Sequence, residues 1–144
     1  METLMPTSTE EIAMVKQSFE DLKPRLEPTS IHFYEALFER APHLRELFRE
    51  DLKGQGMRFM NTLGLILANL EEPEENPVDY KELGHLHTML GIKQADFEPM
   101  EDALMESFRE KLGEGKFTPE LEAAWRRAYG LFSKKLIEEG DIPA

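Results

Sequence analysis

Cysteine, long apolar stretches and strand-like patterns are all missing from this chain. None of its 144 residues is a cysteine, which excludes disulfide frameworks, thiolate nucleophiles, zinc ribbons and iron–sulfur clusters. The longest apolar run, around Leu63 to Leu70, is far too short to cross a membrane. Residues 1–9 show neither a basic region nor an apolar run, so no secretory signal is predicted. We therefore expect a soluble, cytoplasmic protein that makes no use of a membrane.

Basic side chains are scarce as well. The chain has 17 lysines and arginines against 29 acidic residues, a formal net charge of −12. Such a surface repels nucleic acids and anionic membranes, and both are excluded as partners. The one dense acidic run, residues 71–77, is typical of a solvated loop between two helices.

What is present is a helical pattern that continues through the whole chain. Its length suits one domain, and no internal repeat or low-complexity segment is visible. Ser8 with Glu11 forms a capping box at the first helix, and Thr118 with Pro119 starts the last one. We predict an all-α fold of about seven helices, over residues 8–24, 28–40, 42–48, 51–70, 78–90, a segment through 97–112, and the segment from 118 onwards.

His87 is the residue with the most informative surroundings. It comes late in an apolar helical pattern that ends at Gly91, and it shares a helix face with Leu83, Leu86 and Leu90. An imidazole on that face points into the core, where burial is costly without a partner. A metal on its free ring nitrogen is one such partner. The commoner alternative is a histidine that is hydrogen-bonded within the core.

Tyr34 and Gln55 are two more polar residues at inward-facing positions. In a dry core each would leave a polar group unsatisfied, at about 1–3 kcal/mol. Tyr34 has the alternative of bonding to the backbone. Gln55 has the alternative of lying exposed at a helix start between Gly54 and Gly56. The helical phase of the other histidines, His32, His43 and His85, predicts exposed side chains.

Motifs in a fixed order extend this pattern. The run Leu83-Gly84-x-x-His87-x-x-x-Gly91-Ile92 comes two helices before an Ala-Trp-x-x-Ala-Tyr-Gly block at 124–130. Phe33-Tyr34-x-x-Leu37-Phe38, Pro42 and Leu47-Phe48 precede it, and His87 follows Gln55 by 32 residues. Together, over about residues 9–137, these motifs resemble the globin family, and in particular single-domain bacterial haemoglobins related to the globin domain of flavohaemoglobins.

The resemblance implies a single globin domain over residues 1–144, with a helical core at about 8–138 and flexible termini. His87 would be the proximal ligand of haem b (iron protoporphyrin IX). Tyr34 and Gln55 would be the distal pair, as in bacterial haemoglobins and flavohaemoglobins. That pair implies tight, slowly released O2.

A porphyrin also needs two apolar walls, because it is a broad apolar disc with two carboxylates. The His87 helix offers one wall and the long central helix the other, although most of these residues would pack together without a cofactor. Arg58, at the pocket mouth, would pair with a haem propionate or else remain solvated. The remaining expected contacts are Phe48, Phe59, Leu63, Leu83, Leu86, Leu90, Ile92, Phe97, Met100 and Phe132, with Leu104 beside them.

On the proximal side the chain departs from the flavohaemoglobin pattern. Those proteins support the proximal histidine with a buried tyrosine and glutamate. The corresponding positions here hold Phe97 and Gly140. We therefore expect His87 to be closer to a neutral imidazole bonded to a backbone carbonyl. This departure argues against peroxidase-like chemistry and against a dedicated nitric oxide dioxygenase.

The expected function is binding of O2, and of NO and CO, at a pentacoordinate or weakly hexacoordinate iron, with Gln55, Tyr34 or Met57 as the internal ligand. Oxygen transport and conversion of nitric oxide to nitrate are roles that the resemblance raises. No flavin or nicotinamide domain follows in the 144 residues, so turnover would need an external reductase. The alternatives are a gas sensor acting through a protein partner and a haem-free interaction module. His87 argues against the module. A monomer and a homodimer are both compatible with the pattern.

Overall fold

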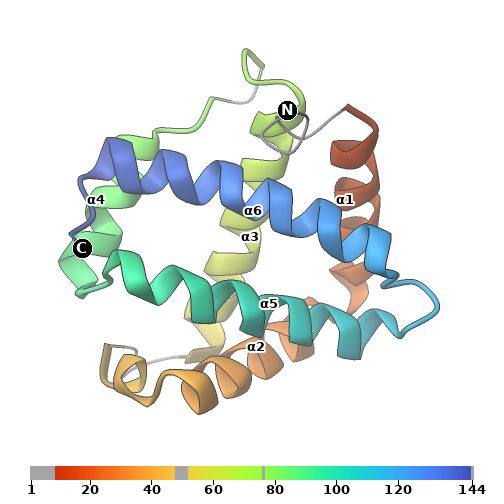
Figure 1. The fold of residues 1–144 in the computed structure, drawn as a ribbon, viewed down its shortest axis with the longest axis horizontal. Helices are drawn as coiled ribbons and strands as arrows, with labels where there is room; N and C mark the ends of the chain where they lie inside the picture. Colours follow the sequence, from red (N-terminus) through yellow and green to blue (C-terminus); the bar gives the residue numbers. More distant parts are fainter. Residues whose placement is uncertain (1–8, 48–51, 76, 144) are drawn as a thin grey trace.

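The computed structural model describes residues 9–47, 52–75 and 77–143 (Figure 1). Within these residues there are helices and turns and no strand, so the expected all-α class is confirmed. The six α-helices are α1 (Thr9–Leu22), α2 (Leu26–Arg40), α3 (Leu52–Glu71), α4 (Tyr80–Leu90), α5 (Phe97–Leu112) and α6 (Pro119–Gly140). Three short 3-10 helices join them: η2 (Lys23–Arg25), η3 (Pro42–Leu47) and η4 (Gln94–Asp96).

The helix boundaries follow local signals. Thr118 accepts a hydrogen bond from the backbone N–H of Leu121, and Pro119 occupies the first turn of α6, as predicted. Asp79 caps α4 by accepting from Glu82 N at 3.0 Å, so that helix begins at Tyr80. The Ser8 cap lies outside the described residues.

One expected helix is not an α-helix. The segment that begins at Pro42 forms the 3-10 helix η3. The described residues therefore hold six α-helices rather than seven. Short 3-10 segments are common just after α-helix ends, and η3 begins two residues after α2 ends.

The centre of the core is Trp125 on α6, which is wholly buried. Its indole Nε1 donates to Ser18 Oγ on α1 at 2.8 Å, and its ring lies 4.7 Å from that of Phe108 on α5. This satisfies the indole N–H while the ring stays in an apolar environment. One tryptophan thus ties three helices together.

The other helices pack around this centre. α2 lies against α5 and α3, and α4 lies beside the C-terminal end of α6 (Figure 1). Within the described chain, no helix combines the length and the apolar character needed to traverse a membrane.

Candidate functional site

A cavity of about 260 Å³ lies between α2, α3 and α4. It has a largely apolar lining with a few polar side chains, the usual composition of a small-molecule site. Most of the predicted site residues meet here. The lining consists of Phe33, Tyr34, Leu37, Gln55, Arg58, Phe59, Thr62, Leu83, His87, Ile92 and Met100.

His87 enters the cavity from the last turns of α4. Its Nδ1 lies 2.8 Å from the carbonyl oxygen of Leu83, one turn earlier. Since a carbonyl only accepts, Nδ1 carries the proton, and Nε2 is the ring nitrogen available to a ligand or metal. A backbone carbonyl is the partner that the sequence predicts for this imidazole.

The turn that ends α4 holds His87 in place. Gly91 adopts a left-handed conformation with φ 92°, and its N–H bonds back to Thr88 O at 3.0 Å. The N–H of Ile92 bonds to His87 O, also at 3.0 Å. This is a Schellman-type helix end, in which glycine takes up the positive φ without strain. The turn brings Ile92, which is buried, to the cavity wall.

Tyr34 faces the cavity from α2 and is only 6% exposed. Burial raises the pKa of its phenol to about 12, and the nearby positive charge of Arg58 opposes that shift only partly. The hydroxyl therefore keeps its proton at neutral pH and can donate a hydrogen bond. The ring stacks on Phe38 with centroids 5.6 Å apart, which restricts its orientation.

Gln55 contributes the most unusual atom of the cavity. Its Oε1 is buried and has no hydrogen-bond partner among the described residues. Leaving a buried polar atom unsatisfied costs about 1–3 kcal/mol. The amide can turn over and present Nε2 instead, a donor in the same place. The cavity thus contains an unused polar group that a bound molecule could satisfy.

Three lining residues were absent from the prediction: Phe33, Leu37 and Thr62. Phe33 stacks almost parallel on Phe59, with centroids 4.9 Å apart and an interplanar angle of 3°. Helical spacing could have found Thr62, because it lies seven residues, or two turns, after Gln55. Phe33 and Leu37 belong to the motif that carries the globin resemblance, but the sequence alone does not place them in the cavity.

Several expected contacts do not line this cavity. Leu63, Phe97 and Phe132 are buried in the core instead, although the Phe97 ring lies 6.1 Å from that of His87. Leu86 is 50% exposed and lines a neighbouring groove instead. The structure does not describe Phe48 or the side chain of Leu90, so both expectations lie outside the described residues.

The other histidines have different surroundings. His43 and His85 are exposed, as predicted. The prediction for His32 was wrong, because its side chain is only 24% exposed and Nε2 lies 3.2 Å from Glu106 Oε2. Pairing with the carboxylate draws this ring onto α5.

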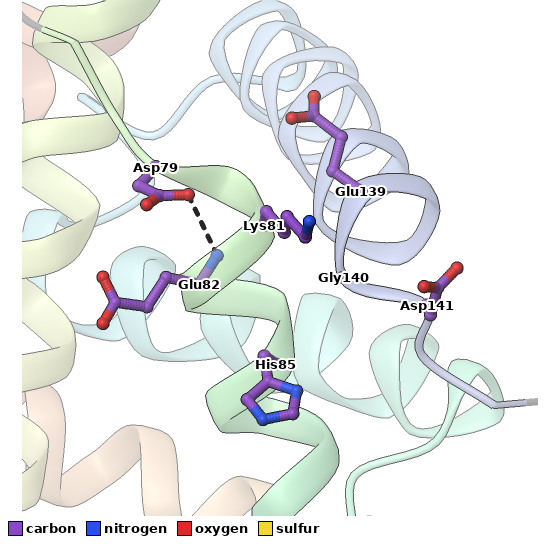
Figure 2. A pocket seen from close by; sticks show the side chains of 7 residues that line it. All are labelled: Asp79, Lys81, Glu82, His85, Glu139, Gly140 and Asp141. Atoms are coloured by element: carbon purple, nitrogen blue, oxygen red, sulfur yellow. Dashed lines mark hydrogen bonds between the residues drawn. The ribbon is translucent and has the colours of Figure 1, made fainter.

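A second cavity, of about 400 Å³, lies on the opposite side of α4 and includes His85. Figure 2 shows three of its four acidic side chains, Glu82, Glu139 and Asp141, pointing in different directions, while the fourth, Asp79, accepts from the backbone N of Glu82. Within the described ranges, no three His, Asp or Glu side chains are grouped to hold a metal ion. Gly140 lies at this cavity where α6 approaches α4 (Figure 2).

Comparisons with known proteins agree with the fold. The Globin family model matches residues 31–136, and the chain belongs to the globin family. A flavohemoprotein of Oceanobacillus iheyensis is 31% identical over 88% of this chain. A flavohemoprotein of Bordetella pertussis is 31% identical over 90% of it. The chain spans only 31% and 33% of the length of these two relatives.

A plant protein of more similar length also matches. The protein of Arabidopsis thaliana named "Anaerobic nitrite reductase AHB2" is 31% identical over 81% of this chain and 83% of its own length. Membership of the family implies a haem.

The residues of the cavity fit that group. His87 offers Nε2 as a ligand atom, because its other ring nitrogen, Nδ1, is already hydrogen-bonded to Leu83 O. The apolar lining suits a porphyrin. The unpartnered amide of Gln55 marks the part of the cavity where a polar bound molecule could form a hydrogen bond.

Proposed function

We propose that this globin holds a haem b through His87 and binds O2, or another diatomic gas, on the side of the cavity formed by Tyr34 and Gln55. The single observation that carries the proposal is the unpartnered, buried Oε1 of Gln55, in the same cavity as His87. In an apolar core an unsatisfied amide only destabilises the fold, whereas in a gas-binding pocket it can form a hydrogen bond to the bound gas.

On the α4 side of the cavity, His87 would hold the haem iron through Nε2. Its Nδ1–H donates to a backbone carbonyl rather than to a carboxylate. A neutral acceptor leaves the imidazole less electron-rich than a carboxylate would. His87 is therefore a plain anchoring ligand, which favours gas binding over bond-breaking chemistry.

On the distal side, two donors would face the gas. When bound, the haem iron supplies the coordination position at which a diatomic gas accumulates partial negative charge. Tyr34 keeps its proton because of its raised pKa and donates from α2. Gln55 donates through Nε2 from α3 once its amide is turned inward. Donors preorganised in a water-poor pocket stabilise such charge strongly, so we expect slow release of O2.

At the mouth of the cavity, Arg58 is exposed while still lining it. A guanidinium in that position suits a haem propionate. The apolar wall formed by Phe33, Phe59 and Met100 would pack against the ring and exclude water.

Conversion of nitric oxide to nitrate is the second candidate activity. The reaction NO + O2 + e⁻ → NO3⁻ needs one electron per turnover, which an external reductase would supply. The Tyr34 hydroxyl in the cavity favours this activity, since it would hold O2 in place. The backbone partner of His87 argues against it as a dedicated role. A sensor function would require a partner whose binding depends on the gas.

The first experiment compares absorption spectra of the purified chain and of two matched variants, His87→Ala and His85→Ala. Spectra are taken oxidised, reduced, and reduced under O2 and under CO. We expect one haem per chain in the wild type and in His85→Ala, with iron coordination lost or altered in His87→Ala. The reduced spectrum also distinguishes a pentacoordinate iron from one bound by Gln55, Tyr34 or Met57. A folded, colourless wild type that takes up no added haem would refute the proposal.

A further inference from the structure

We infer that the backbone contact between Gly84 on α4 and Gly140 on α6 positions His87, so that both glycines are positioning residues for the haem-binding histidine. The inference rests on the proposed function. In the flavohaemoglobin pattern a glutamate at position 140 would support the histidine. In this chain the direct contact between α4 and α6 would orient it instead.

The contact is too close for any side chain. A Cβ added to Gly84 would lie 2.5 Å from Leu136 O and 2.6 Å from Gly140 Cα. A Cβ added to Gly140 would lie 2.4 Å from Gly84 Cα. These neighbours are backbone atoms, which cannot rotate away as a flexible side chain can. Neither glycine has a positive φ, so the reason for glycine here is the close approach rather than backbone conformation.

Gly84 is linked to His87 through a single peptide group. The Leu83 carbonyl that accepts from His87 Nδ1 belongs to the peptide bond joining Leu83 to Gly84. Because that peptide is planar and rigid, any displacement of Gly84 also displaces the acceptor oxygen. Thr88 Oγ1, next to His87, donates to Gly84 O at 3.3 Å. The orientation of the imidazole is therefore coupled to where α6 holds Gly84.

The chain beyond α6 is attached to the segment that follows the His87 helix. Asp141 turns the backbone with φ 53°, and Ile142 is buried. Gln94, in the segment after α4, donates from its backbone N to Pro143 O and from Nε2 to Ile142 O, each at 2.9 Å. Along the chain, His87 thus lies between two attachments, one of Gly84 to the end of α6 and one of Gln94 to the residues just after α6.

This arrangement matters because α6 is the principal helix that α4 packs against in the described chain. α6 itself is anchored by its buried Trp125. The position of the histidine helix is set from α6, and the contact at Gly140 leaves no space for a glutamate side chain that could reach His87.

The test compares Gly140→Ala and Gly84→Ala with Gly130→Ala. Gly130 lies on α6, and a Cβ there meets nothing within 4 Å. The first readout is the iron–imidazole stretching frequency of the reduced, gas-free haem protein. We expect a shifted frequency in Gly140→Ala and Gly84→Ala and the wild-type frequency in Gly130→Ala. A folded, haem-loaded Gly140→Ala protein with the wild-type frequency would overturn the inference.

The second readout needs no haem. The imidazole ¹⁵N signals of His87 in the cofactor-free protein report whether Nδ1–H is bonded to Leu83 O. We expect these signals to move in Gly140→Ala and to stay in Gly130→Ala, and unchanged signals in Gly140→Ala would refute the positioning role. If the wild type did not bind haem, only the proposed function would be refuted. The ¹⁵N signals of the cofactor-free protein would still test whether the Gly84–Gly140 contact positions His87.

A third variant covers the case in which neither glycine substitution folds. Gln94→Leu removes only the side-chain hydrogen bond to Ile142 O. We expect this variant to fold. We also expect its His87 ring signals to differ from those of the wild type, because α4 would be held less firmly. Signals identical to those of the wild type would then overturn the inference.

Discussion

Gly56 on α3 faces Ser30 on α2 so closely that a Cβ on Gly56 would lie 2.8 Å from both Cβ and Oγ of Ser30. The same Cβ would lie 3.2 Å from the ring of Tyr34. Gly56 directly follows Gln55. The crossing of α2 and α3 at this glycine therefore brings Tyr34 and Gln55, the two residues proposed for the gas-binding side, to one cavity.

We predict that Gly56→Ala lowers the free energy of unfolding, by about 1–3 kcal/mol, because overpacking at a tight crossing forces the helices apart. The better helix propensity of alanine would return up to about 1 kcal/mol of this. Chemical denaturation measures the loss. Ser30→Gly in the same chain should restore part of the stability, since it removes the atoms that clash. A Gly56→Ala protein as stable as the wild type would contradict the close crossing.

Replacing Tyr34 with phenylalanine tests the distal donor. Loss of one hydrogen bond to a charged or strongly polar ligand costs about 1–3 kcal/mol, so O2 should dissociate faster by about five-fold to more than a hundred-fold. Rapid-mixing kinetics of the haem-loaded protein measure the rate. Tyr80→Phe is the matched control, because the Tyr80 hydroxyl donates to Asn69 Oδ1 at 3.0 Å, away from the cavity. Equal dissociation rates in wild type and Tyr34→Phe would exclude the distal role.

Gln55→Leu should separate stability from function. The substitution removes a buried oxygen that has no partner among the described residues. We therefore expect the cofactor-free variant to be at least as stable as the wild type, with a gain on the order of 1 kcal/mol. In the haem-loaded protein, the same change should speed O2 dissociation. A variant that loses stability while keeping the wild-type dissociation rate would show that the amide serves the fold instead.

The helical periodicity of the sequence predicts the class of fold and most helix ends correctly. The reason is that caps such as Thr118 and end signals such as Gly91 act locally. The segment at Pro42 is helical as predicted, but the sequence does not say which type of helix it forms, because α and 3-10 geometry share the same sequence signals over one or two turns.

The candidate site was predictable only in part. Helical phase brought Tyr34, Gln55 and His87 inward, and they line one cavity. Helical phase alone does not distinguish residues that line the cavity from residues beside it. For this reason Leu86 was predicted to face inward, although it is 50% exposed. The Gly84–Gly140 contact joins positions 56 residues apart, and no local pattern reveals which two glycines meet.

The chain has three tyrosines, and burial raises the pKa of each phenol above its ordinary value of 10.0. The pKa values of Tyr34 and Tyr80 rise to about 12, and that of the deeply buried Tyr129 rises further. A phenol whose pKa is higher in the folded state holds its proton more tightly there. This stabilisation is complete below the unfolded pKa and is lost as the pH rises through the folded pKa.

We therefore predict that the free energy of unfolding of the cofactor-free protein is insensitive to the tyrosines below about pH 9. It should fall between the unfolded pKa of 10.0 and the folded value of about 12. The ultraviolet absorbance of tyrosinate should show almost no ionisation of the native protein at pH 10.0, where the same chain in denaturant is half ionised. Tyr34→Phe should remove part of the alkaline loss of stability. A tyrosine that titrates freely in the native protein near its ordinary pKa would contradict the buried position of that residue, and for Tyr34 it would remove the case for a protonated donor in the cavity.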